Sequence, residues 1–276
     1  MSVKESDNLL VALYGSFQNN NKNKFMSEQK FTVPVELIDL PSKGLVYAKE
    51  NALSSGQVEM KYMTAKEEDI LTNVNLLRQG LAIEKMLKSL IKSPINYEDL
   101  TLGDRNGLLI AARILAYGKD YSFSYKNPNT GEEEKVDIDL QTLKYKELDW
   151  SLFGNKNEFE FVLPHSKNTV TFKLLTLVDD KKIDEEIKGI KKMVGQDAGS
   201  ISTRLKHQIL SVNGDYSTKT VREFIDQGYL LSRDSIELRK YIESVTPDID
   251  LTIYFTLKDG TEVKTDLPMT AEFFFP

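Results

Sequence analysis

The sequence has no cysteine, and this absence excludes whole classes of functional site. Without thiols the chain can form no disulfide scaffold, no cysteine-ligated zinc or iron–sulfur centre and no thiol nucleophile. Histidine is scarce as well, because the 276 residues include only His165 and His207. We expect both imidazoles to be solvated or packed, and we expect no metal site and no cofactor.

Long apolar runs and a basic region are missing too. The longest later apolar stretch, residues 108–117, contains Arg113 and is far shorter than the roughly 20 residues that cross a membrane. The first residues are acidic and do not resemble a secretory signal. The net charge is −6, and only seven of the 36 basic residues are arginine, the usual reader of guanine and phosphate. We therefore expect a cytoplasmic protein with no membrane and no nucleic-acid partner.

The N-terminal region is rich in asparagine and lysine and has no periodicity over residues 15–30, which indicates a flexible linker. Before it, Leu9, Leu10, Leu13 and Tyr14 fall at helical spacing. These four side chains are candidates for binding a partner protein. Docking back onto the same chain and fraying are equally compatible with the pattern.

After the linker, the sequence predicts regular elements. Residues 58–62 alternate as a half-buried strand would. Thr64 and Glu67 form a capping box, so a helix is expected to begin there, with an apolar face that continues to about residue 92. A break in this helix at Gly80 is left open.

A further helix is expected with Asp104 as its N-cap and Gly118 as its C-terminal stop. The alternating residues 121–140 then predict a β-hairpin, with its turn at residues 127–131.

The second half of the chain predicts a similar order of elements. A hairpin over residues 159–174 is followed by apolar stripes typical of helices up to Gly195, over Ile201–Val212 and at residues 221–225. Asp234 is expected to open another helix, and Asp259-Gly260 forms the turn of a final hairpin.

The two halves align as a divergent internal repeat. Lys61-Tyr62-Met63-Thr64 matches Lys173-Leu174-Leu175-Thr176 at a shift of 112 residues, and Asp104 matches Asp234 at a shift of 130. Chance alignment of amphipathic elements is the alternative. The repeat predicts an α+β fold with two related helix-plus-β-hairpin domains. The expected division is a flexible extension (1–30), a first α+β domain (31–150) and a second α+β domain (151–276).

Two acidic pairs are the candidates for catalytic chemistry. Asp137 and Asp139, and likewise Asp248 and Asp250, place two carboxylates on one side of a strand, where they could bind a divalent ion. Solvated acids at strand ends explain the same pattern. A carboxylate-dependent metal hydrolase is therefore an alternative hypothesis, and no enzymatic activity is the favoured one.

Three adjacent aromatic residues, Phe273, Phe274 and Phe275, lie close to the C-terminus. Such side chains bury little unless the chain's own sheet or a partner covers them, and the sequence leaves these two alternatives open. We treat all three as candidate partner-binding residues.

Several segments resemble the baseplate hub and hub-assembly proteins of T-even-type contractile-tailed bacteriophages. The segment Leu40-Pro41-Ser42-Lys43-Gly44 resembles that family's Leu-Pro-Ser-x-Gly opening, and residues 63–71 resemble its most specific segment. Gly103-Asp104-Arg105-Asn106, with the following residues to Gly118, resembles a further block. The resemblance covers residues 31–140, with weaker similarity onward to Pro276.

The resemblance implies a non-enzymatic structural or chaperone-like protein, made late in infection, that acts while the central hub of the tail baseplate is built. The implied partners are other phage baseplate hub proteins, with no small-molecule substrate. The implied location is the host cytoplasm during tail assembly and, for a hub component, the virion. Family members often carry a Cys-Pro-x-Cys-like element where this chain has residues 127–131, which puts a zinc-stapled hairpin there in doubt. A protein-interaction module unrelated to phage is a further alternative.

Overall fold

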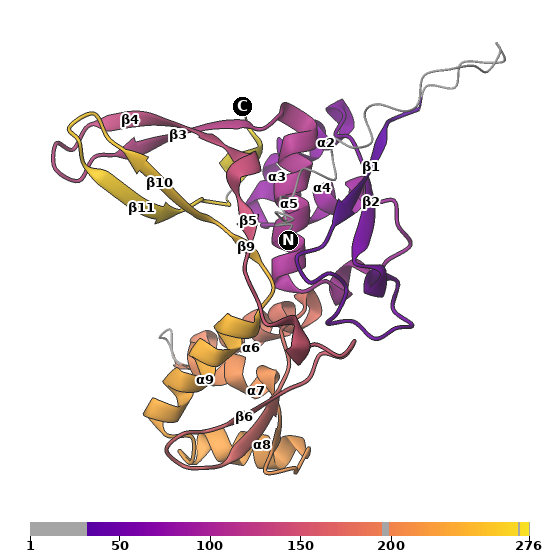
Figure 1. Ribbon diagram of the computed structural model, residues 1–276, viewed down its shortest axis with the longest axis vertical. Helices are drawn as coiled ribbons and strands as arrows, with labels where there is room; N and C mark the ends of the chain where they lie inside the picture. The colour runs from indigo at the N-terminus through magenta and orange to yellow at the C-terminus, as the bar shows by residue number, and fades with distance from the viewer. Residues whose placement is uncertain (1–31, 195–198, 270, 276) are drawn as a thin grey trace, which may run out of the picture.

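The computed structural model describes residues 32–194, 199–269 and 271–275 (Figure 1). Short helices and small antiparallel sheets alternate along the chain, which confirms the α+β expectation. The helices are α2 Ala65–Leu71, α3 Val74–Arg78, α4 Ala82–Leu90, α5 Leu102–Tyr117, α6 Leu177–Val194, α7 Ser200–Gln208, α8 Thr218–Asp226 and α9 Ser232–Val245.

Within the described ranges, the strands form four two-stranded sheets and one three-stranded sheet, β6-β7-β8. The pairs are β1-β2, β3-β4, β5-β9 and β10-β11, and every pairing is antiparallel. Their bounds are β1 Val35–Asp39, β2 Gln57–Lys61, β3 Asp120–Lys126, β4 Glu133–Asp139, β5 Lys144–Tyr145, β6 Phe159–Val162, β7 Thr169–Phe172, β8 Ile209–Val212, β9 Ile249–Asp250, β10 Thr252–Thr256 and β11 Glu262–Asp266.

The elements gather into three parts (Figure 1). The hairpin β1-β2 lies beside α2 to α5, and helices α6 to α9 surround the sheet that contains β6. The hairpins β3-β4 and β10-β11 lie side by side and project as an arm. The ring of Phe255 on β10 contacts Phe123 and Tyr125 on β3 edge to face, with centroid distances of 5.9 and 5.2 Å. The arm therefore joins hairpins from opposite halves of the sequence.

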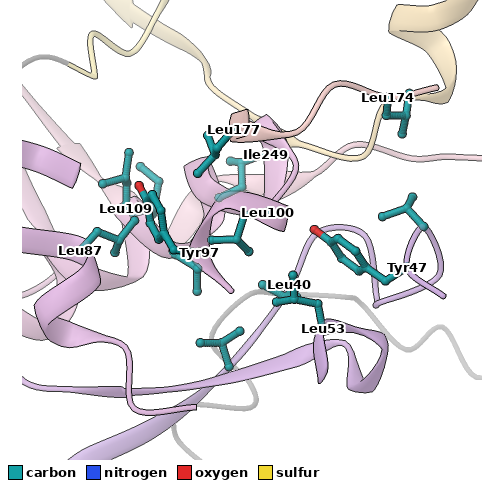
Figure 2. Packing of buried hydrophobic residues seen from close by; sticks show 14 of the residues in the cluster. Leu40, Tyr47, Leu53, Leu87, Tyr97, Leu100, Leu109, Leu174, Leu177 and Ile249 are labelled. Atoms are coloured by element: carbon teal, nitrogen blue, oxygen red, sulfur yellow. The ribbon is translucent and has the colours of Figure 1, made fainter. Parts of the chain in front are cut away.

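One hydrophobic core connects the two helical parts. Figure 2 shows Leu177 and Ile249 of the second half beside Leu100 of the first. The Leu177 amide also donates to the Leu100 carbonyl at 2.9 Å. A Cβ at Gly103 would lie 1.9 Å from the Pro247 carbonyl oxygen, so α5 approaches this backbone closely because residue 103 has no side chain.

The apolar face expected from Thr64 to about residue 92 is divided among three helices, which confirms the break left open at Gly80 and adds an earlier one after Leu71. Helix α2 begins at Ala65, as the capping box predicts, but it ends at Leu71. The Asn73 side chain then accepts from the amides of Asn75 and Leu76 and caps α3. Gly80, with φ of +69°, separates α3 from α4. Local side-chain capping therefore divides one apolar stripe into three short helices.

The helix expected over Ile201–Val212 is also wrong at its C-terminal end. Helix α7 ends at Gln208, and Ile209–Val212 forms strand β8 beside β7. The two hairpins expected at residues 121–140 and around Asp259-Gly260 are confirmed as β3-β4 and β10-β11. Gly260 has φ of +84°, which suits a tight hairpin turn.

Candidate functional site

A buried carboxylate, Asp104, holds the Leu40–Gly44 segment in place. The sequence predicts Asp104 as the N-cap of α5, but this prediction is wrong because Thr101 occupies that position. Its side chain is fully buried and accepts from the Ser42 amide (2.9 Å), the Ser42 hydroxyl (2.7 Å) and the Tyr47 hydroxyl (2.5 Å). Burial raises the pKa of Asp104, although the hydrogen bonds from Tyr47 and Ser42 act to lower it. Two of the sequence blocks that carry the family resemblance thus meet at one carboxylate.

Asp234 makes the corresponding contact in the second half. It lies within the first turn of α9, which begins at Ser232, so its expected role as the opening residue is also wrong. Its carboxylate is fully buried and accepts from the backbone amides of His165 (2.8 Å) and Ser166 (2.9 Å). Burial acts to raise the pKa of Asp234, but these bonds outweigh it and lower the pKa. His165 therefore contributes its backbone to a structural contact.

A lysine, a threonine and an acid form a second contact that occurs in both halves. Lys61 Nζ lies 2.7 Å from Glu67, which also accepts from the Thr64 amide (3.0 Å) and the Thr64 hydroxyl (2.7 Å). In the second half, Lys173, Thr176 and Asp179 have the same spacing in sequence and make the same three bonds at 2.7, 3.2 and 3.0 Å. Burial acts against ionisation of Glu67, but bonds from Lys61, Ser89 and Thr64 lower its pKa to about 2.

The turn at residues 127–131 is held by an amide side chain. Asn127 is almost fully buried, and its Oδ1 accepts from the amides of Asn129 (2.8 Å) and Thr130 (3.2 Å). Its Nδ2 donates to Glu134 at 3.0 Å, and Glu134 accepts from the Lys258 amide at 2.8 Å. An ordinary turn of the polypeptide thus fastens the tips of the two hairpins in the arm.

The chain itself covers most of the C-terminal aromatic run. Phe273 and Phe274 are 0% and 1% exposed, whereas Phe275 is 38% exposed. Arg113 Nε donates to the Phe273 carbonyl at 3.0 Å, and the Tyr121 ring packs edge to face on Phe273 at 4.9 Å. Of the three candidates, only Phe275 presents substantial surface to a partner, and its binding role remains a prediction.

The other four candidate partner-binding residues are Leu9, Leu10, Leu13 and Tyr14, and they lie outside the described residues. Their proposed role is therefore still a prediction from sequence.

An open cleft of about 420 Å³ brings Asp137, Asp139 and Asp250 to one surface near the base of the arm. Each carboxylate is engaged by the chain itself: Ser122 donates to Asp137, Lys119 pairs with Asp139, and the Thr252 amide donates to Asp250. The hydrogen bond from Ser122 is the main cause that lowers the pKa of Asp137. Among the described residues, no three His, Cys, Asp or Glu side chains are grouped to hold a metal ion.

Asp248, the last of the four paired acids, and His207 also have partners within the chain. Asp248 accepts from Asn106 Nδ2 at 3.2 Å and from the Ile249 amide at 2.8 Å, and burial raises its pKa. His207 Nε2 lies 2.9 Å from Glu186, so α7 and α6 are joined by this contact.

A groove between α7 and α9 is a surface that sequence reasoning missed. Two adjoining cavities of about 430 and 350 Å³ share Ser200, Ile201, Leu205 and Arg239 as lining residues. Ile201 is 51% exposed, and Ile236, on the facing side of the groove, is 43% exposed. The sequence places Ile201 on the apolar stripe of its helix. Its exposure could not be foreseen, because it depends on where α9 lies.

The fold and these contacts describe an α+β protein whose buried polar groups fasten loops, turns and helix starts. A family model described as T4 bacteriophage base plate protein matches residues 45–275, and the chain therefore belongs to that family. Comparisons with curated proteins and with solved structures give no match.

Membership places the chain among the phage tail baseplate proteins, whose partners are other baseplate proteins. In the part of the chain that the structure describes, none of the helices has the length and apolar character needed to cross a bilayer.

Proposed function

We propose that this chain is a non-enzymatic structural or chaperone-like protein in the assembly of the central hub of the phage tail baseplate. The family match over residues 45–275 is the observation that carries the proposal. The buried carboxylates support it as well, because Asp104 and Asp234 bind backbone and hydroxyl groups of their own chain. Their geometry serves to hold loops in place.

The groove between α7 and α9 is the surface that we assign to partner binding. Exposed Ile201 and Ile236 flank it, and Arg239 adds a polar group to its lining. Apolar residues with a polar border are typical of protein–protein contact sites. The candidate residues near the N-terminus and Phe275 would add further apolar contacts.

The two halves are proposed to be related domains, 31–150 and 151–276, that arose by duplication. The support is that Lys61-Thr64-Glu67 and Lys173-Thr176-Asp179 make matching bonds at matching spacing. The Asp104 and Asp234 contacts, each to a turn that follows a Leu-Pro pair, point the same way.

Co-purification from infected cells tests the proposal. The tagged chain is expected to capture baseplate hub proteins, and the double variant Ile201→Glu/Ile236→Glu is expected to lose them because it places two charges in the groove. Met193→Glu is the matched control, since Met193 is 88% exposed and does not line either cavity of the groove. Equal capture by all three forms would refute the assignment of the groove.

Mass spectrometry of purified virions separates two forms of the proposal. A hub component is present in the finished particle in stoichiometric amounts, whereas a transient assembly factor forms hub complexes in the lysate and is absent from the virion.

A further inference from the structure

On the outer edge of strand β1, Val33, Val35 and Leu37 have no pairing strand in the part of the chain that the structure describes, and their apolar side chains form an exposed row. Sheet β1-β2 has two strands, so β1 has one neighbour among the described residues. At the opposite edge of the sheet, the Lys92 amide donates to the Glu59 carbonyl of β2 at 2.8 Å, and the Glu59 amide donates to the Ser93 hydroxyl at 2.8 Å. The chain thus covers the outer edge of β2. Along β1, the outward-pointing carbonyl of Asp39 accepts from the Tyr145 hydroxyl at 2.8 Å, whereas Val33, Val35 and Leu37 face no further strand within the described residues.

The register shows which residues face the open edge. The Tyr62 amide donates to the Pro34 carbonyl, and the Leu40 amide donates to the Gly56 carbonyl, so even-numbered residues of β1 point their backbone groups at β2. The backbone groups of Val33, Val35 and Leu37 therefore point away from β2. A proline often blocks pairing at a sheet edge, but the missing N–H of Pro34 lies on the inner side, and the outer edge keeps its donors.

The same three residues form an apolar row. Val33, Val35 and Leu37 are 42%, 43% and 52% exposed and, as alternate residues, lie on one face of the strand. Exposed apolar residues on a free edge strand are the arrangement that accepts an additional strand.

We propose that this edge pairs antiparallel with β1 of a second copy of the chain, with Val35 opposite Val35 of that copy. In this register Val33 lies opposite Leu37 of the other copy, and Leu37 opposite Val33. All three pairs join outward-facing backbone groups, and each pair exchanges two hydrogen bonds. The apolar side chains of both copies then meet on one face, and Glu36 lies opposite Pro34. Moving the register by one step to centre on Glu36 would place two carboxylates opposite each other, which is unfavourable.

This interface does not depend on the proposed hub function, and it lies outside residues 45–275 that the family model matches. It buries few residues, so it falls below the roughly 1,200 Å² of a stable interface. The self-association is therefore reversible and concentration-dependent, and covalent trapping is the suitable measurement.

Single-cysteine variants of the full chain provide the test, since the natural sequence has no cysteine to interfere. Directly opposite residues of a hydrogen-bonded antiparallel pair have Cα atoms about 5.5 Å apart, within the range of a disulfide. Val35→Cys is expected to form a covalent dimer under mild oxidation at least about tenfold faster than Val162→Cys, because pairing raises the effective thiol concentration. Val162 is the matched control, because it is 53% exposed on the edge strand β6.

The register is tested with two further variants. Leu37→Cys alone should cross-link no faster than the control, because the two Leu37 Cα atoms lie roughly 13 Å apart along the paired strands. A mixture of Val33→Cys and Leu37→Cys should give the fast heterodimer. In sedimentation experiments, Val35→Lys should remove the concentration-dependent dimer that Val162→Lys retains, because it sets two ammonium groups opposite each other.

Two results would overturn the proposal. One is that Val35→Cys cross-links no faster than the Val162→Cys control and the natural chain is monomeric at every concentration. This result is expected if a different baseplate protein supplies the added strand. The other is fast cross-linking of Leu37→Cys alone, which would require a different register.

Discussion

Replacing Asp234 by asparagine is predicted to destabilise the protein more than the same replacement at Asp104. Both carboxylates are fully buried, and both fasten a distant loop to a helix. They differ in what donates to them. Asp234 accepts from two backbone amides, whose protons are fixed in direction. In Asp234→Asn the side-chain NH₂ must face one of these N–H groups, and neither can turn away.

The magnitude follows from those two bonds. A hydrogen bond to a charged group contributes about 1.5–3 kcal/mol, and a buried donor without a partner costs about 1–3 kcal/mol. With partial relaxation of the turn, we expect Asp234→Asn to lower the free energy of unfolding by about 3 kcal/mol.

Asp104 has more adaptable partners. Its Oδ2 accepts from the hydroxyls of Ser42 and Tyr47, and a hydroxyl can rotate to accept a bond from an amide. Its Oδ1 accepts from the Ser42 amide, which the asparagine carbonyl can replace. The substitution also removes a buried charge. We expect Asp104→Asn to cost about 1 kcal/mol.

Urea unfolding followed by circular dichroism measures both values, and hydrogen exchange of the His165 and Ser166 amides supplies a local readout. These two amides should exchange faster in Asp234→Asn and remain protected in Asp104→Asn. Equal unfolding midpoints for the two variants, or a larger loss in Asp104→Asn, would refute the reasoning from fixed and rotatable donors.

The other predictions concern packing and acid stability. Gly103→Ala should destabilise by at least about 2 kcal/mol, because its Cβ would overlap the Pro247 carbonyl, whereas Gly189→Ala in α6, with no atom within 4 Å, should stabilise by about 0.5–1 kcal/mol; thermal melts that rank the pair the other way would contradict this. Phe273→Ala should cost about 3–5 kcal/mol in urea unfolding and the more exposed Phe275→Ala much less, and similar costs would show that the C-terminal run is not packed as described. The pKa of Glu67 is lowered from 4.5 to about 2, so the folded protein binds fewer protons than the unfolded chain in this range; about 3 kcal/mol of stability present above pH 4.5 should be lost as the pH falls toward 2. Unfolding titrations should show a weaker loss in Glu67→Gln, and an unchanged pH profile would exclude this role.

The sequence predicts those elements of the fold whose signals are local. The start of α2 at Ala65 follows from Thr64 and Glu67, which contact each other three residues apart. The turn of the β10-β11 hairpin follows from Asp259-Gly260 in the same way. In these places the residues that form the contact are also neighbours in the chain.

The sequence could not predict contacts between distant residues. The sequence predicts Asp104 and Asp234 at helix entrances, because aspartate is a favoured residue at the N-cap of a helix. Their true partners lie 62 and 69 residues away in the sequence. Strand β8 was missed because Ile209–Val212 continues an apolar stripe, and only pairing with β7 makes it a strand.

The candidate site shows the same limit. Whether Phe273 and Phe274 face a partner or their own chain depends on Arg113 and Tyr121, some 150 residues earlier. The α7–α9 groove depends on tertiary placement alone.

Isolation of the tagged natural chain from phage-infected cells, with mass spectrometry of the bound proteins, tests whether the chain acts in hub assembly. We expect strong enrichment of baseplate hub proteins over an untagged control. Recovery of the folded chain with no tail protein bound would contradict it.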